Sequence, residues 1–176
     1  TSKNEKIEYE YLINTSPLNH FLKLFKDEKL KKLQKELSYN KVLVFNLGFN
    51  KKSKLKKEHW LYIPSKECNY YRIGFYDNIL GTDKLSMYIE IGYPKDAKIT
   101  DKEIDKQLEL TLKNLKEQEI IDDTTKLVDH VALIMDPAYV HIEKETDEKI
   151  KEELEKLSKK KIYSIGRYGA WTYCSM

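Results

Sequence analysis

The residue types best suited to binding a ligand lie in positions 162–176. The apolar residues at 162–165 predict a short strand, and Gly166 ends it with a backbone that another group could approach closely. Arg167 adds a planar fork of donors that matches phosphate or carboxylate. This arrangement predicts a strand that ends at a bound ligand, although spacing alone is equally compatible with a solvent-facing turn and a frayed tail. Amphipathic rings follow at Tyr168, Trp171 and Tyr173.

Other arrangements that carry chemistry are missing from the sequence. Two cysteines, Cys68 and Cys174, are too few for a disulfide framework or a zinc site. The four histidines are scattered without an i, i+4 pair. The chain has no Ser-His-Asp order, no P-loop and no carboxylate pair that stands out from its surface acids. We therefore expect no metal site, and the residues by themselves indicate no particular reaction.

The charge balance argues against nucleic acid as a partner. The chain carries 32 basic and 29 acidic residues, for a formal charge of +3, so no large electrostatic field is expected. Five lysines at 51–57 form a local cluster, and a solvated turn is the favoured interpretation because a nucleic-acid site needs more basic residues on the same face. No apolar stretch approaches the roughly 20 residues of a membrane span, and no signal peptide precedes Thr1. We expect a cytoplasmic protein without a membrane span.

The elements that would position these residues follow from the hydrophobic pattern. Residues 7–14 predict a first strand, and Ser16 with Pro17 suits a helix start, because Ser caps free N–H groups and Pro fits the first turn. Asp27 is placed to cap a second short helix. The almost unbroken apolar run at 42–49 predicts a strand that is central in its sheet and covered on both faces.

The rest of the chain predicts further strands and two longer helices. Residues 85–93 alternate cleanly, with their larger apolar side chains on one face. Thr100 and Glu103 form a capping box at the start of one helix, and Thr146 is placed to cap the last. Further strands are expected at 59–63, 70–76 and 126–135, and a turn is expected at 77–83.

This order of elements predicts an α+β fold. The links between the middle strands have hairpin length, which favours an antiparallel or mixed sheet of about five to seven strands with helices packed mainly on one face. The length of 176 residues is enough for a sizeable core.

Two segments resemble motifs of one group of proteins. The run I-G-R-Y-G-A-W-T-Y-C-S-M at 165–176 resembles I-G-R-[FY]-G-x-W-x-Y-x-x-M, and Y-E-Y-L-I-N-T-S-P-L at 9–18 resembles Y-D-Y-L-I-N-T-x-P-L. Both motifs belong to FAD-dependent flavoproteins of the protoporphyrinogen oxidase, amine oxidase and UDP-galactopyranose mutase group. Residues 59–64 and the pair Tyr71-Arg72 fall where group members carry similar aromatic strands. The resemblance spans nearly the whole chain.

The resemblance implies positions for FAD and for a substrate. In that group the Gly-Arg pair lies against the flavin, and the turn after the first strand lies close to the flavin ring. The implied substrate contacts are Arg72, Tyr139 and Tyr173, although Tyr139 suits a role in closing the edge of the core at least as well. The implied cofactor contacts are Thr15, Pro17, Gly166, Arg167, Tyr168, Gly169 and Trp171.

Together with this resemblance, the glycine pattern predicts that the chain is part of a longer flavoprotein. None of its six glycines forms G-x-G-x-x-G, so the dinucleotide-binding half lies outside this sequence. We expect residues 1–17 and 159–176 to belong to the FAD domain of the parent, and residues 18–158 to form its substrate-binding domain. The isolated chain is not expected to retain FAD.

Because the strands at 7–14 and 162–165 each end in a turn implied to lie at the flavin, we expect them to pair in parallel and to bring Asn14, Thr15, Gly166 and Arg167 to one edge. The rings of Tyr168, Trp171 and Tyr173 are then expected at this exposed edge and outside the main core.

Three functions follow as alternatives. The first is the substrate-side domain of an FAD-dependent oxidoreductase acting on a small molecule. The second is the same part of a UDP-galactopyranose mutase-like enzyme with a nucleotide-sugar substrate. A diphosphate is usually held by a pair of arginines, and the chain has only Arg72 and Arg167, which weighs against the mutase. The third is a non-catalytic interaction module that uses the lysine cluster at 51–57 and the aromatic strands.

Overall fold

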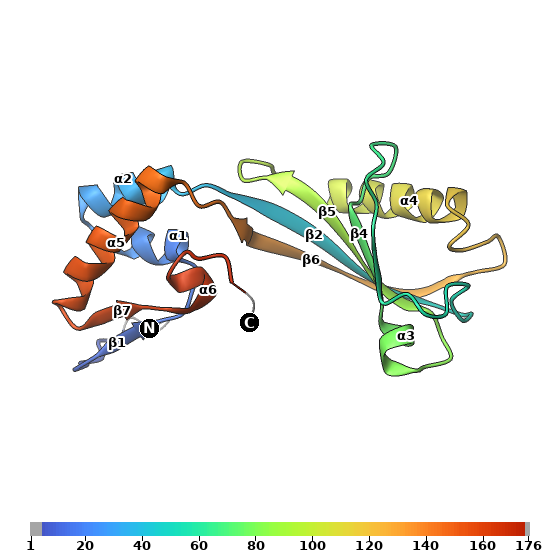
Figure 1. Ribbon diagram of the computed structural model, residues 1–176, viewed down its shortest axis with the longest axis horizontal. Helices are drawn as coiled ribbons and strands as arrows, with labels where there is room; N and C mark the ends of the chain where they lie inside the picture. The colour runs from blue at the N-terminus through green and yellow to red at the C-terminus, as the bar shows by residue number, and fades with distance from the viewer. Residues whose placement is uncertain (1–4, 175–176) are drawn as a thin grey trace. The chain divides into compact units, whose positions relative to one another are not determined.

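The computed structural model describes residues 5–174, which form two compact units. Unit 1 comprises the described parts of Thr1–Tyr39 and Tyr139–Met176, and unit 2 comprises Asn40–Ala138. Within the described residues, unit 1 holds a two-stranded parallel sheet and unit 2 a five-stranded antiparallel sheet. The expected α+β class is confirmed (Figure 1).

Unit 1 packs short helices and one long helix around a small apolar core. The side chain of Asp27 accepts hydrogen bonds from the backbone N–H groups of Lys29 and Leu30, which confirms the expected cap of the second helix. The elements of unit 1 are β1 (Leu12–Asn14), α1 (Leu18–Phe21), η1 (Leu22–Leu24), α2 (Glu28–Glu36), α5 (Lys144–Ser158), β7 (Ile162–Ser164) and α6 (Gly166–Gly169). The buried core includes Leu18, Leu22, Leu33, Leu37, Ile150, Leu157 and Trp171.

One predicted cap in unit 1 is wrong. Thr146 lies inside α5, and Glu143 occupies the N-cap position without a side-chain cap bond. Thr146 is buried, and α5 begins three residues before the position that the capping pattern predicted. The expected inward positions are confirmed at Ile150 and Leu157, which are both buried.

Unit 2 is built on the sheet order β3-β4-β5-β2-β6, with α4 along one face (Figure 1). The Thr100 hydroxyl accepts a hydrogen bond from the Glu103 N–H at 3.3 Å, so the predicted capped helix is confirmed. The elements are β2 (Tyr39–Phe49), β3 (Trp60–Tyr62), β4 (Arg72–Phe75), α3 (Tyr76–Leu80), β5 (Ser86–Pro94), α4 (Asp101–Glu117) and β6 (Leu127–Val140).

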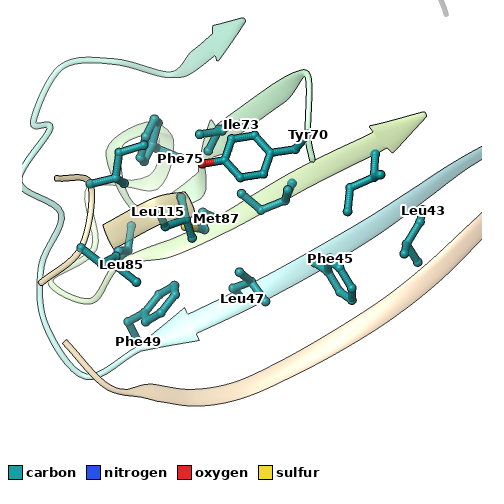
Figure 2. Packing of buried hydrophobic residues seen from close by; sticks show 14 residues of the cluster. Leu43, Phe45, Leu47, Phe49, Tyr70, Ile73, Phe75, Leu85, Met87 and Leu115 are labelled. Atoms are coloured by element: carbon teal, nitrogen blue, oxygen red, sulfur yellow. The ribbon is translucent and has the colours of Figure 1, made fainter. Parts of the chain in front are cut away.

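The core of unit 2 lies between the sheet and α4. The predicted alternation in β5 is confirmed, because Met87, Ile89 and Ile91 are buried while the intervening residues are more exposed. Figure 2 shows Leu43, Phe45 and Leu47 of β2 joining the same cluster. Leu115 reaches this cluster from α4. Full burial of such side chains contributes roughly 1.5–3 kcal/mol each.

Three expectations for unit 2 need correction. Strand β2 lies between β5 and β6, so its expected central position is confirmed, but it is not covered equally on both faces. Its two faces differ, since Phe45 and Leu47 are buried while Val44 and Asn46 are only half-buried. Residues 77–83 do not form a simple turn, because α3 occupies the first four of them and ends at Gly81 with a φ of 68°. The strand expected at 126–135 continues to Val140 as β6.

Candidate functional site

Strands β1 and β7 deliver two turns to one edge of unit 1. They pair in parallel, with Leu12 opposite Ile162 and Asn14 opposite Ser164. Because the strands run the same way, their carboxyl ends lie together (Figure 1). Ligands of open parallel sheets bind outside such carboxyl ends. The predicted pairing of two segments about 150 positions apart is confirmed.

A buried polar contact locks these two turns together. The Asn14 amide donates to the Ser164 hydroxyl at 2.7 Å, and that hydroxyl donates to the Gly169 carbonyl at 2.7 Å. The Asn14 side-chain oxygen accepts from the backbone N–H of Ser16 at 3.2 Å. The backbone N–H of Ile165 donates to the Asn14 carbonyl at 2.9 Å. The turn after β1 and the turn after β7 therefore form one hydrogen-bonded structure.

The two glycines of the C-terminal turn have different surroundings. Gly166 has a φ of 79°, and no atom lies within 4 Å of the position that a Cβ would take, leaving out its chain neighbours. Its backbone is thus open to approach by another group. A Cβ at Gly169 would lie 2.9 Å from the Asn14 carbonyl oxygen. Gly169 was predicted as a cofactor contact, and the structure places it against β1 as a close-packing residue.

Arg167 is surrounded by aromatic rings of unit 1. Its guanidinium lies 5.8 Å from the ring centroids of Tyr139 and Tyr168 and 5.0 Å from that of Tyr173. The Nη1 group donates to the carbonyl of Cys174 at 2.6 Å. Cation–π contacts of this kind restrict the guanidinium without neutralising its charge. The structure thus brings together four of the residues singled out from the sequence.

Trp171 departs from its expected position. The tail rings were expected at the exposed edge, but Trp171 is 2% exposed and lies in the unit 1 core, edge-on to Tyr39 at 5.8 Å. Trp171 therefore packs in the core of unit 1, where burial of its large ring stabilises the fold. Of the remaining positions, Thr15 is exposed in the turn after β1, and Pro17 precedes α1 as its N-cap residue.

Unit 2 presents a second group of candidate residues on the face of its sheet opposite α4. Cross-strand neighbours lie on the same face, and the register sets Tyr62 opposite Arg72, Arg72 opposite Glu90, and Gly74 opposite both Trp60 and Tyr88. Ile73 and Ile89, which alternate with them, point into the core. We call this the open face, and it comprises Trp60, Tyr62, Arg72, Gly74, Tyr88 and Glu90.

Arg72 occupies the centre of the open face as half of an ion pair. Its Nη1 lies 3.3 Å from Oε1 of Glu90, and both side chains are mostly shielded from solvent, at 25% and 13% exposure. The guanidinium lies 5.6 Å from the Tyr62 ring centroid and 5.4 Å from that of Tyr88. The Tyr71 hydroxyl also donates to Glu90. The substrate contact predicted at Arg72 thus falls in unit 2, whereas Tyr139 and Tyr173 fall in unit 1.

A shallow cavity adjoins the open face. It has a volume of about 260 Å³, and its lining includes Asn46, Gly48, Tyr76 and Val131. The Tyr76 hydroxyl donates to the Asn46 side-chain oxygen at 3.1 Å, and the Tyr76 and Tyr88 rings lie 5.3 Å apart. Burial raises the pKa of the Tyr88 phenol, so this ring stays neutral at physiological pH.

Sequence reasoning missed several residues of these two sites. The alternating pattern in β5 places Tyr88 and Glu90 opposite the core, but it did not mark them as site residues. Asn14 was expected at the edge formed by the two turns, but its contact with Ser164 was not, because that contact depends on a pairing between distant segments. Tyr62 was part of an expected aromatic strand, but nothing in the sequence set it beside Arg72.

The described residues hold neither a metal-binding cluster nor a membrane-spanning helix. Residues 5–174 contain no group of three or more His, Cys, Asp or Glu side chains arranged to hold a metal ion. In the same residues, no helix is long and apolar enough to cross a membrane.

Comparison with known proteins gives a fold relationship. No protein-family model matches the chain. The structure is similar to reduced UDP-galactopyranose mutase, with a TM-score of 0.86 and 21% identity, covering 98% of this chain and 38% of that one. A protein described as a protoporphyrinogen oxidase from Exiguobacterium sp. 255-15 is similar with a TM-score of 0.65 and 11% identity. The match covers 88% of this chain and 35% of that one. A CLA-producing fatty acid isomerase from P. acnes is similar with a TM-score of 0.57 and 15% identity. The match covers 91% of this chain and 37% of that one.

These comparisons define the class to which the fold belongs. The chain has the fold of a portion of these proteins, and two of the three bear names from the group that the sequence resembles. The resemblance is therefore confirmed at the level of the fold. The chain spans between 35% and 38% of the length of the proteins it matches.

Proposed function

We propose that these residues are the substrate-side portion of a longer FAD-dependent enzyme. Unit 1 contributes one wall of the flavin site through the turns at Thr15 and Gly166, and the open face of unit 2 contacts the substrate. The observation that carries the proposal is the parallel pairing of β1 and β7, which brings both flavoprotein-like turns to one edge. The shared fold with flavoproteins of known structure supports it.

The residues at this edge fit part of a flavin site. Gly166 leaves its backbone open to a flat group, and Arg167 offers donors for a flavin carbonyl or a phosphate. A dinucleotide also needs a glycine-rich cradle at a helix N-terminus, and none of the six glycines of this sequence forms one. We assign that cradle to another part of the parent protein. When bound, FAD supplies the electron-transfer or nucleophilic chemistry.

The side chains around this edge have positioning roles in the proposal. Asn14 and Ser164 hold the two turns in one arrangement through buried hydrogen bonds. Tyr168 and Tyr173 restrict the orientation of the Arg167 guanidinium. A restricted donor loses less conformational entropy when it binds its acceptor. These residues would bind and orient the cofactor rather than react with the substrate.

For the reaction itself, we favour hydride transfer from a small-molecule substrate by an FAD-dependent oxidoreductase. A mutase must hold a diphosphate, and Arg72, the arginine of unit 2, is already paired with Glu90. A UDP-galactopyranose mutase-like reaction is the second candidate, because the fold match to such an enzyme covers 98% of the chain.

The interaction-module alternative receives less support. In the lysine cluster at 51–57, Lys52 pairs with Asp83 at 3.5 Å and Lys54 pairs with Asp122 at 3.4 Å. These acids offset part of the positive charge that a polyanion would need. The cluster therefore fits a solvated loop.

The flavin assignment is tested by substitution in the longer parent protein. Arg167→Ala should lower the fraction of FAD retained after desalting, because it removes the charged donors at the open edge. Lys54→Ala is the matched control, since it also removes one positive charge but lies in unit 2. Equal FAD retention in both variants, or a parent protein that binds no flavin, would contradict the proposal.

A further inference from the structure

We propose that Glu90 determines the substrate class at the open face. By neutralising Arg72, it makes this face a binding surface for an uncharged, flat group and excludes anionic groups such as phosphate. The inference rests on the proposed function, in which the open face of unit 2 contacts the substrate.

The ion pair between Arg72 and Glu90 sets the charge of the open face. Arg72 would be an attractive anion site if its guanidinium were the dominant charge of the face. Instead, the Glu90 carboxylate lies 3.3 Å away and is the more buried partner, at 13% exposure. The Tyr71 hydroxyl donates to the same carboxylate and holds it in place. An incoming phosphate would have to compete with Glu90 for the guanidinium and would also face a like charge in a partly desolvated site.

Aromatic rings set the shape of the open face. A Cβ at Gly74 would lie 1.8 Å from Cε1 of Tyr88, so the Tyr88 ring lies directly across this glycine on the neighbouring strand. The ring therefore covers the backbone of β4. Tyr62 and Trp60 stand beside it on β3, and both are more than half exposed, at 65% and 52%. Exposed rings on a sheet face favour flat partners, because offset stacking removes the most apolar area from water.

The pair also leaves room for a polar but uncharged partner. Arg72 donates hydrogen bonds and Glu90 accepts them. A hydroxyl or amide group of a ligand can therefore accept from Arg72 and donate to Glu90 without changing the net charge of the face. The adjoining cavity of about 260 Å³ is lined largely by apolar surface. A ring bearing hydroxyl or amide groups therefore matches this face in charge, shape and hydrogen bonding.

A matched pair of probes tests the inference on the 176-residue chain. Both p-nitrophenyl β-galactoside and p-nitrophenyl phosphate carry the same flat ring, but only the second carries an anionic group. The chain has two tryptophans, so its two indole N–H signals in an NMR spectrum can be assigned with Trp60→Phe. The galactoside should shift the Trp60 signal in a saturable way, and the phosphate should leave it unchanged.

The variant Glu90→Gln should reverse this preference. It removes the neutralising charge while keeping the shape of the side chain, so affinity for the phosphate probe should rise by about tenfold or more. Glu109→Gln on α4 is the control, since it changes the net charge equally at an exposed position. Equal binding of both probes to the unsubstituted chain, binding of neither, or a Glu90→Gln variant that still rejects phosphate would overturn the inference. FAD retention by the longer protein tests the flavin assignment separately.

Discussion

At the scale of single residues, Gly166 and Gly169 lie in one turn but are glycines for different structural reasons. Gly166 adopts a φ of 79°, which favours glycine, and it faces open space. Gly169 is required by close packing, because a side chain there would collide with the backbone of β1. The sequence motif contains both glycines but does not distinguish these reasons. Of the two, only Gly166 leaves the space beside its backbone open.

The packing role of Gly169 predicts a specific loss of stability. Gly169→Ala places a Cβ 2.9 Å from the Asn14 carbonyl oxygen, so the turn must shift, and the free energy of unfolding should fall by about 1–3 kcal/mol. Gly92→Ala is the control, because its Cβ would meet the Tyr71 ring at an ordinary 3.7 Å. Denaturant unfolding of the two variants measures the difference. Equal stability would show that the turn adapts without cost.

At the scale of elements, the contact between Asn14 and Ser164 joins β1 to β7. Both side chains are nearly buried, and each also bonds to the backbone of its own turn, so either substitution removes several buried hydrogen bonds. Asn14→Ala and Ser164→Ala should each lower the free energy of unfolding by about 1–3 kcal/mol. The double variant should lose less than the sum of the two, since both substitutions remove the same hydrogen bond. Strictly additive losses in denaturant unfolding would mean that the two side chains act independently.

A second contact between elements should appear as a pH dependence of unit 2. The Tyr93 hydroxyl of β5 donates to Glu103 in the first turn of α4 at 3.1 Å. Burial and this hydrogen bond raise the pKa of Tyr93 from 10.0 to about 12. A raised pKa in the folded state stabilises the fold below pH 10, and this contribution is lost as the pH rises from 10 to 12.

Tyr93→Phe removes this contribution. Between pH 10 and pH 12, its free energy of unfolding should therefore fall less than that of the unsubstituted protein. Thermal unfolding of both proteins across this range gives the comparison. Parallel curves would show that Tyr93 ionises equally easily in the folded and unfolded states.

The same elements show what local sequence patterns could predict. The alternation in β5 and the Thr100 cap of α4 each depend on neighbouring residues, and both were predicted correctly. The apolar run in β2 identified a strand, but it could not show whether the second face is covered, because that depends on which helices pack there. Helix α3 has only five residues, too few for a helical period to be recognised.

At the scale of the whole molecule, the two units depend on pairings between distant segments. Residues before Tyr39 and after Tyr139 pack together in unit 1, with Trp171 in the shared core. Composition and periodicity cannot show such pairing. The parallel strands β1 and β7 were predicted only because both end in turns that resemble flavin contacts. The assignment of residues 1–17 and 159–176 to an FAD domain and of 18–158 to a substrate domain stays a prediction about the parent.

The division of the flavin site predicts how the isolated chain behaves. Without a glycine-rich cradle, the 176 residues offer FAD only one wall, so affinity should be too weak to survive desalting. A mixture with FAD should yield a colourless protein, measured by absorbance in the flavin region. The longer parent, treated in the same way, should remain yellow. A stoichiometric yellow complex with the isolated chain would contradict the division of the site.

Hydrogen–deuterium exchange on the longer parent protein tests most directly whether the flavin lies at the carboxyl edge of β1 and β7. Addition of FAD to the flavin-free protein should slow exchange at residues 14–17 and 165–168, because a bound flavin would exclude water from both turns. Residues 51–57 should exchange at the same rate with and without FAD. Unchanged exchange at both turns, in a protein that demonstrably binds FAD, would contradict the account.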